Sequence, residues 1–203
     1  MYLTKIELDL GNRTVRGALG DCQRMHRLLN GLFDCSRDEV KLLYRIQNSG
    51  RNCAVYLYSE SPVIRDKILP FMVLAGERDV TAWQSTMTEG RRVRFDLLTM
   101  PSKKVAQTDG RNSRRRILRT EEERMVWLAR KASQNGFEIL DVQELEADSF
   151  AGNHEAEQGG RMNWDTYHYR GILEIRDASA FQKALSCGIG PGKAYGLGMI
   201  LLI

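Results

Sequence analysis

The sequence predicts an α+β protein built from two similar halves, since its length, composition and repeated order of strand and helix patterns agree. Its 203 residues suffice for one or two domains of ordinary size. A content of 42% hydrophobic and 28% charged residues is typical of globular proteins and excludes a disordered, fibrous or disulfide-held small protein. No apolar run approaches the ~18 residues that a membrane-spanning helix needs.

The first half reads as β-α-β-β-α-β. Residues 2–10 alternate apolar and polar side chains, as a strand with one buried face does, and residues 22–33 carry an apolar stripe at helical spacing. The remaining expected elements are a hairpin of residues 38–47 and 52–59 around Asn48-Ser49-Gly50, a second helix after Pro62, and a strand at 92–98.

The second half repeats this order after a Gly- and Arg-rich connector at residues 102–118. Its first strand must lie near residues 97–101 or be nearly lost. The other expected elements are a helix begun by a capping box at Thr120 and ended before Gly136, strands at 137–145 and 167–176, a mobile polar loop at 149–163, a helix at 178–187, and a strand at 199–203. We therefore predict two tandem ferredoxin-like (RRM-like) βαββαβ domains, residues 1–98 and 99–203.

Charge is distributed unevenly along the chain. The formal net charge is only +4, but residues 101–119 hold seven basic side chains and one acid, a local +6. Residues 137–165 hold eight acids and one arginine, a local −7. One face should therefore attract a polyanion. The N-terminus lacks the pattern of an export signal, and the four cysteines show no metal or disulfide spacing, so we expect a cytoplasmic protein with reduced thiols and no membrane partner.

Among the three histidines, His26 is the candidate for acid–base chemistry. It falls on the shoulder of the apolar stripe of the first helix, where the ring can pack on one side and reach solvent on the other. An imidazole moves protons near neutral pH, and Arg24 and Arg27 beside it would attract phosphate. A histidine at the edge of the core is the alternative. His154 and His168 are expected to have surface roles.

The chemistry that remains open is cleavage of RNA without a metal. The sequence has no D-x-D or H-E-x-x-H spacing, no Walker loop and no G-x-S-x-G elbow, so we expect no metal and no cofactor. A basic protein with one well-placed imidazole suits a reaction in which the RNA's own 2′-hydroxyl attacks the adjacent phosphate.

The most distinctive motif lies near the end of the chain: Gly188-Ile189-Gly190-Pro191-Gly192-Lys193-Ala194-Tyr195-Gly196-Leu197-Gly198. Its glycines would let backbone N–H groups approach phosphate closely, with Lys193 adding a charge. A plain structural turn is the alternative.

This motif, together with Met25-His26-Arg27, the N-terminal Met-Tyr-Leu-Thr-Lys and Val126-Trp127-Leu128, resembles the CasE family. These proteins are the CRISPR repeat-processing endoribonucleases of the type I-E Cascade complex. The resemblance covers nearly the whole chain. It implies tandem ferredoxin-like domains and metal-independent cutting at the 3′ base of the repeat hairpin. It further implies 2′,3′-cyclic phosphate and 5′-hydroxyl ends, with the product retained among other Cascade subunits.

The resemblance also implies roles for particular residues. His26 matches the catalytic histidine, with Gln23, Arg27 and Lys193 as possible support. The RNA-binding residues would be Arg91, Arg92, Arg94, Lys103, Lys104, Arg111, Arg114, Arg115, Arg116, Arg119, Gly190, Gly192, Lys193, Gly196 and Gly198. The chain departs from the family at four positions: Gln23 replaces a tyrosine, Gly31 a lysine, and Asp96 and Leu98 stand where arginine is usual. The second acid–base group is therefore left open.

Three alternatives stay open at this point. Arg114, Arg115 and Arg116 could form a merely solvated charge run instead of an RNA contact. The chain could be a non-catalytic RNA-binding module, although the RNP1 pattern is absent and Tyr56 and Tyr58 are weak substitutes for its aromatic residues. A small phosphatase on the same fold is the third, but it would not need the basic connector.

Overall fold

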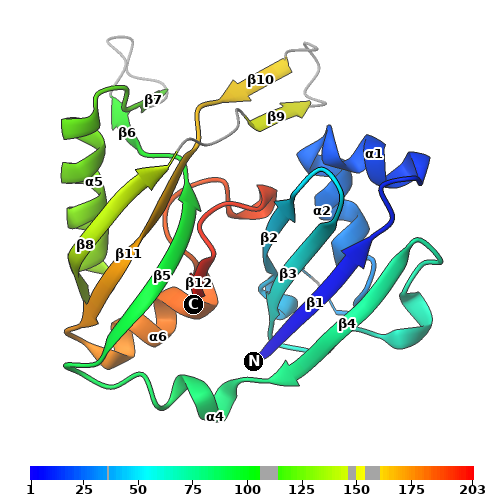
Figure 1. Ribbon diagram of the computed structural model, residues 1–203, viewed down its shortest axis with the longest axis horizontal. Helices are drawn as coiled ribbons and strands as arrows, with labels where there is room; N and C mark the ends of the chain where they lie inside the picture. The colour runs from blue at the N-terminus through cyan, green and yellow to red at the C-terminus, as the bar shows by residue number, and fades with distance from the viewer. Residues whose placement is uncertain (36, 106–113, 146–149, 154–160) are drawn as a thin grey trace.

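A computed structural model describes residues 1–35, 37–105, 114–145, 150–153 and 161–203 (Figure 1). Within these residues the strands form two four-stranded antiparallel sheets and two short hairpins. The two large sheets stand side by side in Figure 1, the N-terminal one on the right and the C-terminal one on the left. This arrangement confirms the α+β prediction of two ferredoxin-like units.

The first sheet has the strand order β2-β3-β1-β4. Its strands are β1 (Tyr2–Leu8), β2 (Leu43–Asn48), β3 (Cys53–Ser59) and β4 (Met72–Asp79). The helical elements of this half are α1 (Arg13–Leu19), α2 (Cys22–Asn30), α3 (Arg37–Val40) and the short 3₁₀ helix η1 (Arg65–Lys67). Alternate residues such as Ile6 and Val55 point to one face, where they pack with Met25 and Leu29 of α2. The predicted hairpin between β2 and β3 is confirmed.

The second sheet has the order β12-β5-β11-β8. Its elements are β5 (Arg92–Thr99), α5 (Glu121–Gln134), β8 (Phe137–Leu145), β11 (Tyr167–Ile175), α6 (Ala178–Cys187) and β12 (Ile200–Leu202). Both helices pack on one face of this sheet around a core that includes Phe95, Trp127 and Phe181. The side chain of Thr120 accepts a hydrogen bond from the backbone N–H of Glu123, which confirms the predicted cap.

Two predictions about the first half are wrong. The alternating segment at 92–98 does form a strand, but β5 pairs with β11 and β12, so it opens the second sheet instead of completing the first. The sheets therefore divide the chain between β4 and β5, not at residue 98. The fourth strand of the first sheet is β4, and only η1 stands where a second helix was expected after Pro62.

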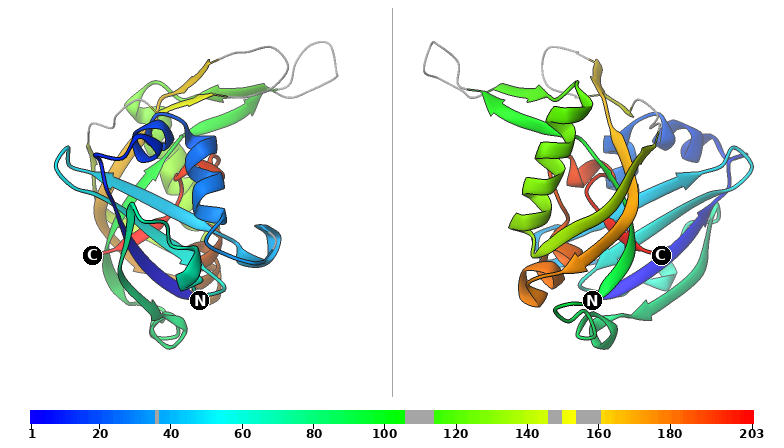
Figure 2. Two further views of the ribbon diagram at one scale, coloured as in Figure 1. Left: turned by 90° about the vertical axis from the view of Figure 1, so that its right-hand side faces the viewer. Right: turned by 60° about the vertical axis from the view of Figure 1, so that its left-hand side comes forward.

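The two hairpins are insertions in the second unit. β6 (Ser102–Val105) pairs with β7 (Arg114–Ile117), and β9 (Phe150–Asn153) pairs with β10 (Arg161–Trp164). Both extend from the same end of the molecule in Figure 2. The expectation of a mobile loop at 149–163 falls partly on residues 154–160, which lie outside the described residues.

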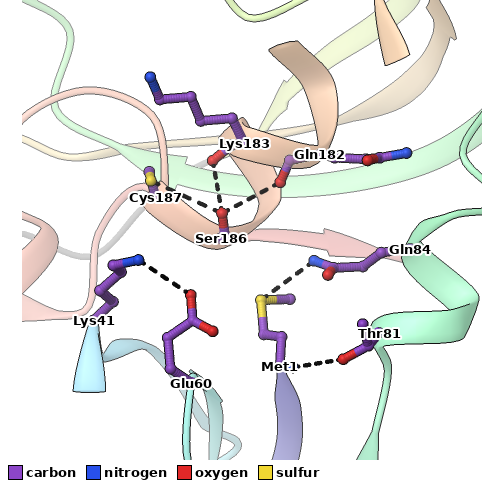
Figure 3. A network of polar contacts seen from close by, with 9 residues as sticks. All are labelled: Met1, Lys41, Glu60, Thr81, Gln84, Gln182, Lys183, Ser186 and Cys187. Atoms are coloured by element: carbon purple, nitrogen blue, oxygen red, sulfur yellow. Dashed lines mark hydrogen bonds and ion pairs between the residues drawn. The ribbon is translucent and has the colours of Figure 1, made fainter. Parts of the chain in front are cut away.

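The halves meet through an apolar cluster that joins β2 and β3 to the end of the chain. Leu43 and Tyr58 pack there against Met199 and Leu201. The short helix α4 (Thr81–Gln84) links the halves, and Met1 contacts Thr81 and Gln84 beside it (Figure 3). The four cysteines, all in the described part of the chain, are free thiols.

Beside this cluster, one buried carboxylate joins the two sheets. Asp96 of β5 accepts hydrogen bonds from Arg45 Nη2 of β2 at 3.1 Å and from Arg170 Nε of β11 at 2.6 Å, and His168 Nε2 lies 2.7 Å away. Burial favours the neutral acid, but the hydrogen bonds from His168 and Arg170 and the positive charge of Arg45 outweigh it and hold the pKa of Asp96 below its ordinary value. His168 is half-buried beside this carboxylate instead of having the expected surface role.

Candidate functional site

The helix α2 presents His26. Asp21 begins the helix by accepting hydrogen bonds from the backbone N–H groups of Gln23 and Arg24, at 2.9 and 3.3 Å. Met25 and Leu29 are buried, which leaves His26 on the shoulder of the buried stripe with a half-buried ring, as predicted.

The ring of His26 has ordered neighbours on two sides. The Asn30 Nδ2 amide lies 2.9 Å from His26 Nε2, one helical turn away. When this amide donates, its hydrogen occupies the lone pair of Nε2, so the ring is the neutral tautomer with its proton on Nδ1. On the other side the ring stacks on Tyr44, with centroids 6.3 Å apart and planes 24° apart. The packing therefore restricts the orientation of the imidazole.

Tyr44 also connects His26 to the glycine-rich segment at residues 188–198. Its hydroxyl donates to the carbonyl of Ala194 at 3.2 Å. That carbonyl belongs to the short 3₁₀ helix η2 (Lys193–Tyr195), which packs against α2 and β2. Burial raises the pKa of Tyr44, so its hydroxyl keeps its proton. The structure thus brings His26 and the neighbourhood of Lys193 together, although 167 positions separate them in the sequence.

Packing accounts for the glycines of this segment. Gly190, Gly192, Gly196 and Gly198 all have φ near +80°, which favours glycine. A Cβ at Gly196 would lie 2.9 Å from the ring of Tyr44. These contacts favour the interpretation as a structural turn for the glycines themselves, and a role of their N–H groups in phosphate binding stays a prediction.

A basic groove of about 600 Å³ begins at this turn. Its floor includes Trp127 of α5 and Ile189, and its rim carries six cationic side chains without a carboxylate: Lys103, Lys104, Arg115, Arg130, Lys131 and Lys193. Three segments supply them, namely the β6–β7 hairpin, the C-terminal half of α5 and the turn at 188–198. We call this feature the basic groove.

The cations crowd one another in the basic groove. Burial lowers the pKa of Lys131 from its ordinary value, and the charges of Arg130, Lys193 and Arg115 lower it further. Such crowding is unfavourable in the free protein and is relieved by an anion. A phosphodiester backbone is the ligand that matches several adjacent cations.

The sequence analysis did not single out Arg130, Lys131 or Asn135, which also line the basic groove. A basic pair near the end of a helix is ordinarily explained by the helix dipole. Their position within the last six residues before Gly136, soon after the Trp127 motif, was the available signal.

The other predicted residues are dispersed. Gln23 and Arg27 share the exposed side of α2 with His26, whereas Arg116 forms an ion pair with Glu123 at 2.5 Å and Arg119 is exposed outside the basic groove. Arg91, Arg92 and Arg94 lie at or near the N-terminal end of β5, and the basic groove lies near the C-terminal end of this strand. Arg92 also forms an ion pair with Glu174 at 2.7 Å. Arg111 lies outside the described residues, and of Arg114 only the strand position is described.

The described residues show neither a metal-binding cluster nor a membrane-spanning helix. They contain no group of three or more His, Cys, Asp or Glu side chains that could hold a metal ion. None of their helices has the length and apolar character needed to cross a membrane.

The chain matches known proteins over its whole length. It is 29% identical to the CRISPR-associated endoribonuclease Cse3 of Thermus thermophilus, with 98% of each chain covered. A solved structure of the endoribonuclease Cse3 bound to 19 nt RNA superposes with a TM-score of 0.88 at 25% identity and full coverage of both chains. A chain of a CRISPR RNA-guided surveillance complex shares the fold, with a TM-score of 0.76, 23% identity and coverage of 100% and 99%. The family described as CRISPR associated protein matches residues 1–203, and the chain belongs to that family.

Proposed function

We propose that this protein is an endoribonuclease that cuts precursor CRISPR RNA at the 3′ base of the repeat hairpin without a metal ion. The observation that carries the proposal is the contact between α2, which presents His26, and the turn that supplies Lys193 to the basic groove. A proton-transfer group thereby lies beside a surface suited to an RNA backbone. The likeness to an RNA-bound endoribonuclease over the whole chain supports the same conclusion.

The proposed reaction uses the RNA's own nucleophile. His26 takes the proton of the 2′-hydroxyl, the 2′-oxygen bonds to phosphorus, and the bond from phosphorus to the 5′-oxygen breaks. The leaving 5′-oxygen takes a proton from solvent water and the protonated His26 releases its proton to solvent, so the products are a 2′,3′-cyclic phosphate and a 5′-hydroxyl. In this proposal Arg27 or Lys193 stabilises the developing negative charge, and Gln23 can orient the 2′-hydroxyl but cannot usefully supply a proton.

The basic groove is proposed to hold one strand of the hairpin stem. An A-form stem is recognised mainly through its phosphates, its shape and its 2′-hydroxyls, because its major groove is too deep and narrow for side chains to read. The six cations of the groove come from three segments of the chain that converge on one depression, which suits contacts to several phosphates. We propose that the product stays bound there and that the protein works beside the other subunits of a type I-E Cascade complex.

The proposal is tested with a repeat hairpin in EDTA, beside the same hairpin with a 2′-deoxy sugar at the cut position. We expect cleavage of the first RNA only, with a cyclic phosphate end detected by mass spectrometry. His26→Ala should abolish cleavage while the Kd for the 2′-deoxy hairpin stays within about twofold, since a lost proton-transfer group costs ~10²–10⁴-fold in rate and little in binding. Equal cleavage by His26→Ala would refute the assignment of His26.

A non-catalytic hairpin-binding module is the second candidate. It is favoured by the departures at Gln23 and Gly31, which remove side chains that the related family uses near the histidine. Tight hairpin binding without cleavage by the unmodified protein, with and without Mg²⁺, would establish it.

A further inference from the structure

A second groove opens between the two large sheets, away from the basic groove. It has a volume of about 1130 Å³, and residues of β1, β2 and β3 form one wall, while Leu98, His168 and Arg170 form the other. Lys5, Arg45 and Tyr56 lie on the face of the first sheet opposite to α2, while the edge of the groove is formed by residues of the α2-side core such as Leu8 and Cys53. We call it the inter-sheet groove. The proposed cleavage reaction leaves it without a role.

One row of side chains crosses the first sheet toward this groove. The strand register places Lys5 opposite Tyr56 and Tyr56 opposite Arg45, so a half-buried aromatic ring lies between two cationic side chains. The next position of β3 on the same face is the small residue Ala54, with Gln47 opposite it. A flat ring beside a small residue leaves space for a planar group to stack.

Positively charged side chains also lie on the wall of the groove that the second sheet forms. Arg170 lies opposite Asp96 in the strand register, and its side chain is 52% exposed although Nε is bound to that carboxylate. Arg45, whose side chain is only 7% exposed, binds Asp96 through Nη2, while its Nε and Nη1 have no hydrogen-bond partner among the described residues. One carboxylate therefore faces two guanidinium groups and an imidazole, which leaves donors and positive charge at this wall.

The rim of the inter-sheet groove is polar. Such a rim is better suited to bind nucleotide bases than to bind the surface of another protein. Gln47, Asn48 and Asn52 supply amide groups, and Arg51 supplies a further cation. Two carboxylates also line the groove: Glu7 is bound to Lys5 at 2.8 Å, and Asp9 accepts the backbone N–H of Gly11 at 2.8 Å. By contrast Tyr58, the neighbouring tyrosine of β3, is buried in the apolar cluster between the sheets. Tyr56 is therefore the tyrosine of this strand that a ligand can reach.

We propose that the inter-sheet groove binds a single-stranded RNA segment that flanks the hairpin, with a base stacked on Tyr56 and a phosphate held by Arg170. Aromatic rings next to cations are the common means by which sheets hold single strands without a strict sequence requirement. The inference rests on the proposed function, because the hairpin delivers the flanking strand. It adds a second RNA site that is distinct from the basic groove and from His26.

The test compares three RNAs that carry the 2′-deoxy sugar at the cut position: the bare hairpin, and the hairpin with a short single-stranded extension on its 5′ or its 3′ side. For the intact protein we expect one extension to lower the Kd about tenfold. Tyr56→Ala and Arg170→Gln should each remove most of this gain and leave the Kd of the bare hairpin unchanged. Tyr56→Phe, which keeps the ring, should retain the gain, and so should Arg65→Gln, which removes an exposed arginine of η1.

Several outcomes would overturn the inference. They are the absence of any gain from either extension, a gain that survives Tyr56→Ala, or an equal loss of bare-hairpin binding in that variant. A protein partner that needs Tyr56 while neither extension matters would make the groove a protein contact instead. Failure of the proposed function is seen separately, because the intact protein would then leave the unmodified hairpin uncut.

Discussion

At the scale of single residues, Tyr44 decides how the candidate site is assembled. Its ring stacks on His26, its hydroxyl binds the carbonyl of Ala194, and its edge fills the space that Gly196 leaves open. A fully buried side chain with three such neighbours transmits a change at any one of them to the others. The position of the imidazole therefore depends on the turn at 188–198.

Gly196→Ala tests this dependence. The new methyl group would lie 2.9 Å from the Tyr44 ring at a φ of +82°, so we expect a loss of about 1–2 kcal/mol in the free energy of unfolding. Cleavage of the hairpin should slow as the ring of Tyr44 shifts. Urea unfolding and single-turnover rates measure the two effects. Gly76→Ala is the matched control, since nothing lies within 4 Å of its added Cβ, and a similar loss in both variants would contradict the account.

Some residues of the candidate site could be predicted from the sequence alone, and others could not. The exposed shoulder position of His26 follows from helical periodicity within α2 and was predicted. The contact of Tyr44 with Ala194 spans 150 positions, and no local pattern encodes it. Arg130 and Lys131 were missed for the same reason, because their relation to Lys193 exists only after folding.

At the scale of elements, the β6–β7 hairpin and α5 together build one wall of the basic groove. Neighbouring arginines on β7 have different partners there. Arg115 lines the groove, with Nη1 donating to Ser102 Oγ at 3.1 Å, whereas Arg116 is paired with Glu123 of α5. Arg115 and Arg116 are therefore not equivalent, contrary to their treatment as parts of one charge run.

Comparing the variants Arg115→Ala and Arg116→Ala tests whether these arginines contact RNA or are merely solvated charges. Each phosphate contact contributes a slope of ~0.7–0.9 to the fall of log K with log salt concentration. We expect Arg115→Ala to flatten the slope for the 2′-deoxy hairpin by about that amount and Arg116→Ala to change it much less. Filter binding over a salt series measures both. Equal slopes for Arg115→Ala and the unmodified protein would favour the solvated interpretation.

The sequence predicted individual strands and helices more accurately than it predicted which strands pair with one another. The alternation at 92–98 correctly indicates a strand, and the predicted cap at Thr120 marks a real helix start. Which sheet a strand joins is set by long-range pairing, so β5 was assigned to the wrong half. The short element η1 after Pro62 replaced an expected helix, because β4 takes the fourth place in the sheet from residue 72 onward.

At the scale of the whole molecule, Asp96 and the apolar cluster fix the two sheets relative to each other. Breaking a buried ion pair is strongly destabilising, because it leaves the other buried charge without compensation. Removing the carboxylate leaves Arg45 buried without its counter-charge. Burial already lowers the pKa of Arg45 to about 10, in spite of the raising effect of Asp96.

Asp96→Asn should lower the free energy of unfolding by about 3–5 kcal/mol in urea denaturation, the usual range for a broken buried ion pair. The folded-state pKa of Asp96 is lowered, so its contribution to stability is present above the unfolded pKa of ~3.9 and is lost as the pH falls through the folded value. The variant should therefore lose less stability between pH 5 and pH 3, a range chosen to span ~3.9. Asp66→Asn, at an exposed carboxylate of η1, is the control, and a comparable loss there would count against the role of Asp96.

The contact between α2 and η2 also has a consequence for synthesis of the protein. A ribosome makes the histidine 167 residues before Lys193, which lies in the turn that packs against its helix. A nascent chain in which this turn has not yet been made therefore carries the imidazole without the wall that orients it and without Lys193. Under the proposed function, such a chain would not cut RNA until the segment at 188–198 has been synthesised and packed.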